Sequence, residues 1–141
     1  MKRLLSVILA LSMIFCFCIS ASAEATEEYN VTPRYQYATD VRSYLTIING
    51  NTANCESVAT GLSGVTKITM VQTLEKHWAL GIFFRVDNAS WTTTEYSNEA
   101  TVINKMYNLD SGTYRMVTDF TFYYGNQTET ITVYSTEKTV A

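Results

Sequence analysis

The sequence predicts an all-β fold, an antiparallel sandwich of about seven strands. Apolar and polar residues alternate with a period of two along most of the chain, which is the pattern of half-buried strands. Tyr and Thr favour pleated surfaces, and all ten Tyr follow residue 23. Turn signals recur at regular intervals, as in a sandwich or a barrel. Alternation alone leaves open whether the sheet closes into a barrel.

The first two predicted strands cover residues 41–48 and 52–60, and the strong turn signal Asn49-Gly50 joins them. In the first strand, alternate residues from Val41 to Ile47 share one face. In the second, one face carries only small residues, which indicates that two sheets come closest there: Ala53, Cys55, Ser57 and Ala59.

The middle of the chain predicts three more strands. Residues 65–74 alternate apolar and polar positions, and Glu75-Lys76-His77 then indicates a polar break. Residues 78–86 alternate again, and Asp87-Asn88 predicts a turn before a Thr-rich edge strand at 90–96. One face of the segment 78–86 carries Trp78, Leu80, Ile82, Phe84 and Val86.

The last three predicted strands cover residues 101–109, 113–124 and 127–135. Asp110-Ser111-Gly112 and Gly125-Asn126 supply the turns between them. The long middle strand of this group has an apolar face made of Tyr114, Met116, Phe120 and Phe122.

A cleavable secretion signal is predicted over residues 1–23. Lys2 and Arg3 precede an apolar run at 4–19, and Ala21-Ser22-Ala23 has the small residues of a cleavage site. The run is shorter than the roughly 20 residues of a membrane-spanning helix, which favours cleavage over an anchor. We expect an extended leader at 24–40 and a sandwich domain at 41–141, secreted to the extracellular space without a membrane partner.

Cys55 is the only cysteine that remains after the predicted signal is removed, since Cys16 and Cys18 lie within it. A secreted domain with one cysteine has no internal disulfide. Its small apolar neighbours indicate that Cys55 is buried. A disulfide between two chains or a reactive thiol is the alternative.

The segment from Asp110 to Met116 resembles the E–F corner of immunoglobulin and fibronectin type III domains, whose immunoglobulin pattern is D-x-G-x-Y-x-C. Asp110, Gly112 and Tyr114 match it, and Met116 stands where the second cysteine would be. The resemblance implies that Tyr114 buries its ring and returns its hydroxyl to the backbone. It also implies that Cys55 and Met116 occupy the places of the paired cysteines, as an apolar pair.

The chain after residue 23 also resembles small secreted β-sandwich proteins of Gram-positive bacteria, a family of unassigned function. The resemblance implies secretion and an immunoglobulin-like fold but no activity. It rests on residues 31–35, 65–68, 111–115, 129–131 and 135–140.

Composition and motifs exclude several function classes. With 10 Lys+Arg against 13 Asp+Glu, the net charge of −3 argues against nucleic-acid binding, and the 47% hydrophobic content argues against disorder. His77 is the only histidine, so a catalytic triad or a zinc site has few residues to draw on. Glu75 and His77 could form a hydrogen bond, but an exposed turn is the simpler interpretation. We expect no metal, no cofactor and no enzymatic activity.

Aromatic side chains are the remaining candidates for binding. An exposed aromatic platform binds sugar rings or a protein partner, and the alternative is that these rings fill the core, above all Trp78. We therefore expect a non-enzymatic binding module for an extracellular protein or glycan. A secreted toxin or antimicrobial β protein, and a carbohydrate-active hydrolase with two carboxylates, are the alternatives. The candidate binding residues are Trp78, Trp91, Tyr123 and Tyr124.

Overall fold

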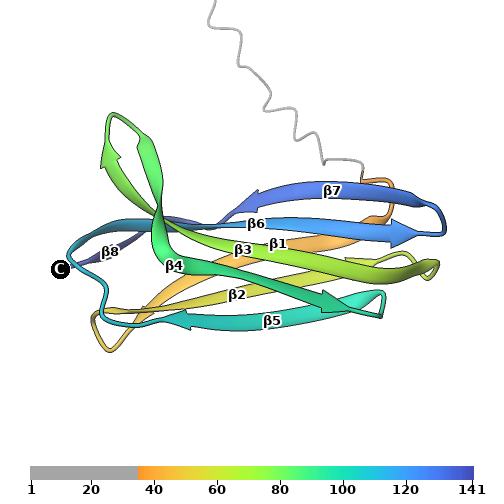
Figure 1. Ribbon diagram of the computed structural model, residues 1–141, viewed down its shortest axis with the longest axis horizontal. Helices are drawn as coiled ribbons and strands as arrows, with labels where there is room; N and C mark the ends of the chain where they lie inside the picture. Colours follow the sequence, from red (N-terminus) through yellow and green to blue (C-terminus); the bar gives the residue numbers. More distant parts are fainter. Residues whose placement is uncertain (1–34) are drawn as a thin grey trace, which may run out of the picture. The chain divides into compact units, whose positions relative to one another are not determined.

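The computed structural model describes residues 35–141 and shows an open antiparallel β-sandwich of eight strands (Figure 1). The predicted all-β sandwich is confirmed, whereas the predicted signal peptide lies outside the described residues. The strands are β1 (Ala38–Ile48), β2 (Thr52–Gly61), β3 (Val65–Ala79), β4 (Ile82–Glu95), β5 (Glu99–Met106), β6 (Gly112–Tyr124), β7 (Gln127–Tyr134) and β8 (Lys138–Val140).

The eight strands form two sheets. One sheet has the order β1-β2-β5, and the other has the order β4-β3-β6-β7, with β8 also paired to β6. β7 and β8 lie in succession along one edge of β6, and Ser135 bridges the gap between them. Its amide donates to the Met116 carbonyl at 2.9 Å, and its hydroxyl accepts the Met116 amide at 2.9 Å. The edge of β6 therefore stays paired along most of its length.

The predicted strand at 78–86 is wrong, because the chain reverses in its middle. Leu80 and Gly81 both have positive φ, 51° and 76°, and they form the turn between β3 and β4. Two consecutive residues with positive φ favour a tight hairpin that follows the twist of its strands. The predicted turn at Asp87-Asn88 is instead a bulge within β4. The alternation predicted one continuous strand because both arms of the hairpin are rich in apolar residues.

The core consists of two apolar clusters, one at each end of the sandwich. The first includes Phe120 and Phe122 with Ile68 and Met70. The second includes Cys55, Met116, Tyr114 and Leu74. The small inward face predicted for β2 is confirmed, since its four members are all buried. Cys55 and Met116 lie in the same cluster, as the resemblance implies.

A buried polar layer separates these two clusters. Each of β1, β2, β3, β5 and β6 contributes one residue to it: Ser43, Ser57, Gln72, Asn104 and Thr118. The Gln72 amide nitrogen donates to the Ser57 hydroxyl at 2.8 Å and to the Cys55 carbonyl at 3.2 Å, and Asn104 donates to the Gln72 oxygen at 2.7 Å. Thr118 lies 2.8 Å from the Ser57 oxygen and 3.0 Å from that of Ser43.

Every buried polar side-chain group of this layer has a hydrogen-bond partner. Among the described residues, no buried side-chain nitrogen or oxygen lacks a partner. An unpaired buried polar group costs about 1–3 kcal/mol, so the layer favours the one register of the two sheets that pairs all its groups.

Candidate functional site

The hairpin of β3 and β4 extends beyond the sandwich (Figure 1). The pairing of β3 with β6 ends at Lys76, opposite Tyr114. Beyond that point the two arms pair only with each other, His77 with Phe83 and Ala79 with Ile82. Because no third strand covers this hairpin, the side chains near its tip face solvent.

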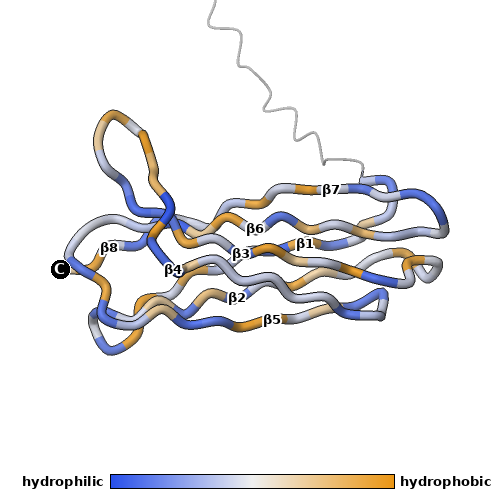
Figure 2. Tube along the Cα trace, in the orientation of Figure 1, coloured by the Kyte–Doolittle hydropathy of each residue, from blue (hydrophilic) through white to orange (hydrophobic). Residues whose placement is uncertain are grey.

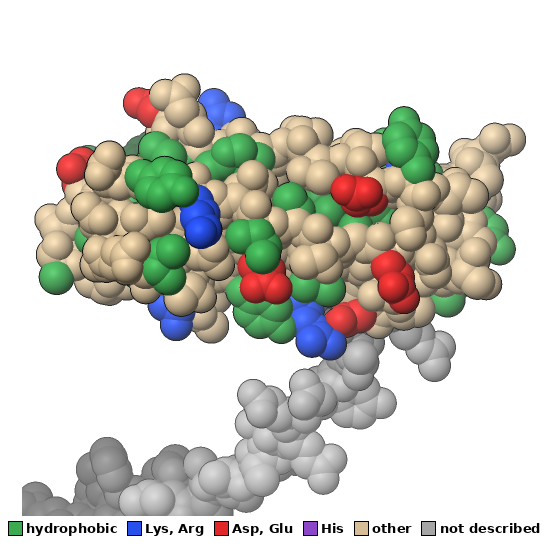
Figure 3. Space-filling view, turned by 90° about the horizontal axis from the view of Figure 1, so that it is seen from below, with side chains coloured by type: hydrophobic (Ala, Val, Ile, Leu, Met, Phe, Trp, Pro, Cys, Tyr) green, Lys and Arg blue, Asp and Glu red, His purple; other side chains and the backbone are tan. Residues whose placement is uncertain are grey.

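The exposed part of the hairpin is apolar. Trp78 is 70% exposed, Leu80 96%, Ile82 44% and Phe84 57%. Figure 2 shows the hydrophobic tip above a hydrophilic root. On the face shown in Figure 3, by contrast, hydrophobic side chains occur in separate groups, with charged and other side chains between them. Contiguous exposed apolar side chains on a soluble protein mark an interaction site.

A bulge redirects β4 at the root of the hairpin. Thr73 pairs with Ser90 and Glu75 pairs with Arg85, so Leu74 alone stands opposite the four residues from Val86 to Ala89. Asn88, with a φ of 57°, adopts the left-handed conformation that asparagine tolerates. Bulges of this kind bend a strand and change the direction of its side chains. The bend allows the hairpin to leave the plane of its sheet.

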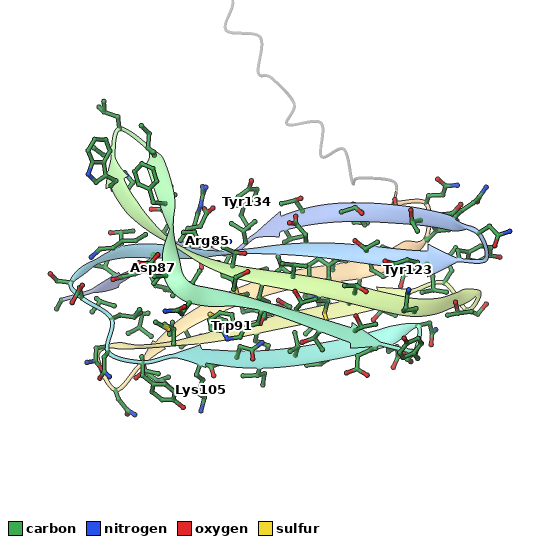
Figure 4. All side chains as sticks on the ribbon, in the orientation of Figure 1. Arg85, Asp87, Trp91, Lys105, Tyr123 and Tyr134 are labelled. Atoms are coloured by element: carbon green, nitrogen blue, oxygen red, sulfur yellow. The ribbon has the colours of Figure 1, made fainter. Side chains whose placement is uncertain are left out.

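One face of the hairpin is braced against the sheet through Arg115. Its guanidinium lies 2.8 Å from the Glu75 carboxylate and 3.9 Å from the ring centre of Phe83. The ring of Tyr134 lies on it at 4.7 Å, and His77 packs edge-on against Phe83. Figure 4 shows Arg85 and Tyr134 near this root. The stacked groups fix the direction in which the hairpin projects.

The other face of the hairpin borders a hollow of about 680 Å³. Trp78 and Phe84 line it, with their rings edge-to-face at 5.8 Å. Lys76 also lines it and places its ammonium 5.5 Å from the ring of Tyr114. Gly112 makes room for the Lys76 stem, because a Cβ there would lie 2.5 Å from Lys76 Cε. The hollow thus combines aromatic walls with cationic and acidic groups at its rim.

The predicted Tyr corner is present at this hollow. The Tyr114 hydroxyl donates to the Asp110 carbonyl at 2.7 Å, and the ring is buried in the second cluster. Gly112 has a φ of 149°, which other residues adopt only with strain. The three residues quoted for the resemblance therefore act together to fix the loop that precedes β6.

The structure does not bring the four predicted binding aromatics together. Trp91 is half-buried against the second cluster, and Tyr123 lies under the Lys67 ammonium at 3.6 Å (Figure 4). Tyr124 stacks on Tyr37 with ring centres 5.0 Å apart. Both tyrosines end β6, whereas the hairpin lies beside its start. Only Trp78 belongs to the exposed hairpin, so the alternative that Trp78 fills the core is wrong.

Leu80, Ile82 and Phe84 join Trp78 on the hairpin, although their alternation predicts a single strand. Gly81 was the residue that could have indicated the turn. A glycine between two apolar segments is as compatible with a reversal of the chain as with a continuous strand. The predicted strand therefore runs across a turn, and its two halves form the separate arms of an exposed hairpin.

Groups that could perform catalysis are engaged elsewhere or exposed. His77 accepts a hydrogen bond from the Gly81 amide at 3.3 Å, and Glu75 pairs with Arg115. Asp87 and Asp110 both line the hollow but are exposed to solvent. Within residues 35–141, no three His, Cys, Asp or Glu side chains gather where they could hold a metal ion.

Cys55 is fully buried, and burial raises the pKa of its thiol to about 12. We predict that a thiol reagent fails to label Cys55 in the folded protein at pH 8 and labels it rapidly in urea, because only the thiolate reacts. Above pH 9 the unfolded chain forms thiolate while the folded chain keeps its proton, so the free energy of unfolding should fall as pH rises. Rapid labelling without denaturant would contradict this burial.

No protein-family model matches the chain, and no curated protein matches it. In the part of the chain that the structure describes, no helix is long and apolar enough to cross a membrane.

Proposed function

We propose that this chain is a secreted, immunoglobulin-like, non-enzymatic binding module that contacts its extracellular partner through the tip of the β3–β4 hairpin. The observation that carries the proposal is the projection of Trp78, Leu80, Ile82 and Phe84 into solvent. Burying one large apolar side chain contributes about 1.5–3 kcal/mol, which a stable fold normally uses in its own core. The exposure of these four side chains is explained if a binding partner covers them.

Two further features support a docking role. The Arg115 stack holds the hairpin in one direction, so little conformational entropy is lost when a partner binds. Trp is also among the residues that most often dominate binding energy, and Trp78 lies near the tip. The strand order and the Tyr114 corner support the immunoglobulin-like part of the proposal.

The hydrolase alternative has less support. A glycosidase needs one carboxyl group that stays protonated, which usually requires an apolar, desolvated site. Asp87 and Asp110 border one hollow, yet both are exposed. The toxin or antimicrobial alternative shares the docking step with our proposal and differs only in the harm that docking does to the target cell.

The test is the sedimentation of the purified, labelled protein with envelopes of the cells that secrete it. We expect wild-type protein to sediment and the double variant Trp78→Ser/Phe84→Ser to stay in solution. Tyr96→Ser is the matched control, because Tyr96 is 84% exposed but lies outside the hairpin. Equal sedimentation of all three proteins, or of none, would contradict the proposal.

A further inference from the structure

We propose that the surface contacted by the hairpin is an anionic phospholipid bilayer, into whose interface the hairpin tip inserts. This inference rests on the proposed function and names its partner. It departs from the sequence-based expectation of no membrane partner, since it involves contact by a short hairpin and no spanning segment.

The order of residue types along the hairpin matches the polarity profile of a bilayer surface. Leu80 and Ile82, both aliphatic, lie at the turn, Trp78 follows along β3, and Phe84 lies at the level of Lys76, with which it pairs. Lys76 and Arg85 lie at the root. Membrane-contacting segments place aliphatic groups deepest, aromatic rings at the headgroup level and cations outside.

The charge of the hairpin differs from that of the chain as a whole. The sequence carries a net charge of −3, yet no acidic residue occurs between Lys76 and Arg85. Both of these cations line the hollow beside the hairpin, and the carboxylates of Asp87 and Asp110 line the same hollow farther from the tip than Lys76 and Arg85. Each Lys or Arg near an anionic membrane surface contributes about 1 kcal/mol, which corresponds to roughly fivefold in affinity. The hairpin is therefore the part of an acidic molecule suited to an anionic surface.

The length of the hairpin limits how deep it enters. A strand rises about 3.3 Å per residue, so Leu80 and Lys76 are separated by about 13 Å. Interfacial segments reach about 5–10 Å into the boundary between headgroups and acyl chains. Leu80, Ile82 and Trp78 then lie at that depth while Lys76 stays among the phosphates. Shallow insertion also keeps the unpaired outer edges of both arms within reach of water.

The experiment uses vesicles of phosphatidylcholine and phosphatidylglycerol in equal parts, with vesicles of phosphatidylcholine alone for comparison. In a Trp91→Phe background, all tryptophan emission comes from Trp78. We expect a blue shift of this emission with the anionic vesicles, together with weaker binding at high salt. Leu80→Asp should reduce binding at least tenfold, whereas Tyr96→Asp should not. Lys76→Gln and Arg85→Gln should each cost about fivefold on the anionic vesicles only.

Several outcomes separate this inference from the proposed function. Failure to bind vesicles, while envelope binding still depends on Trp78 and Phe84, overturns the lipid assignment and leaves the docking role in place. Envelope binding abolished by prior protease treatment assigns a protein partner and likewise overturns it. Unchanged vesicle binding by Leu80→Asp also overturns it, because contact through the tip is then excluded. No binding to envelopes or vesicles overturns both proposals.

Discussion

Replacing Gln72 with Leu is expected to lower the free energy of unfolding by about 3 kcal/mol, although Leu is apolar and similar in size. Gln72 is fully buried at the centre of the polar layer. Its loss leaves the Asn104 amide and the Cys55 carbonyl without the partners that they have now. Each buried group left unpaired costs about 1–3 kcal/mol, and the added apolar contact offsets only part of this.

Urea unfolding followed by circular dichroism measures this effect. Thr118→Val tests the same layer from the neighbouring strand β6, because it removes the hydroxyl that reaches across to Ser43 and Ser57 of the other sheet. Thr121→Val is the matched control on the same strand, where the hydroxyl faces outward and meets Thr130 at the surface. We expect Thr118→Val to destabilise by about 1–3 kcal/mol and Thr121→Val by less than about 0.5 kcal/mol. Equal effects would show that the layer contributes nothing specific.

Replacing Tyr114 with Ala is expected to cost about 3–5 kcal/mol, the range for removing a buried aromatic ring. The ring is buried among Cys55, Met116 and Leu109, and its hydroxyl holds the loop before β6 through Asp110. Tyr114→Phe keeps the ring and removes only the hydroxyl, so it should cost about 1 kcal/mol. The difference between the two variants separates packing in the core from fixation of the corner.

Thermal and urea unfolding of both variants provides the measurement. Tyr107→Ala is the control, because that ring is exposed and belongs to neither core cluster. If too little of the Tyr114→Ala variant folds, Tyr114→Phe still measures how much the hydroxyl contributes to stability. A loss for Tyr114→Phe no greater than that for Tyr107→Ala would show that the corner hydroxyl does not hold the loop.

Much of the fold could be predicted from the sequence because strand alternation reports directly on burial. The inward faces of β2 and β6 are buried as expected, and the turns at Asn49-Gly50 and Gly125-Asn126 are present. These patterns are local, since each depends only on which residues face the same side of one strand.

The polar layer could not be predicted, because it depends on alignment between strands far apart in the sequence. Gln72, Asn104 and Thr118 each look like a break in an apolar face. They become a layer only when pairing brings them to one level of the sandwich. Sequence spacing within a strand contains no information on this alignment.

The candidate site was missed for a related reason. Alternation predicts that Trp78, Leu80, Ile82 and Phe84 belong to one apolar face, but it shows neither the turn between them nor whether anything covers these side chains. Cover depends on how far β6 extends along β3, and their pairing stops at Lys76. The exposure of the hairpin is therefore a property of strand lengths in the assembled sheet.

The central claim is that the hairpin tip stands in solvent, away from the protein's own core. The most direct test is the fluorescence of the Trp91→Phe variant in solution without any partner, because Trp78 is then the only tryptophan. We predict red-shifted emission and quenching by acrylamide nearly as efficient as for free N-acetyl-tryptophanamide. Blue-shifted emission protected from acrylamide would contradict the account, because it would place Trp78 in an apolar interior.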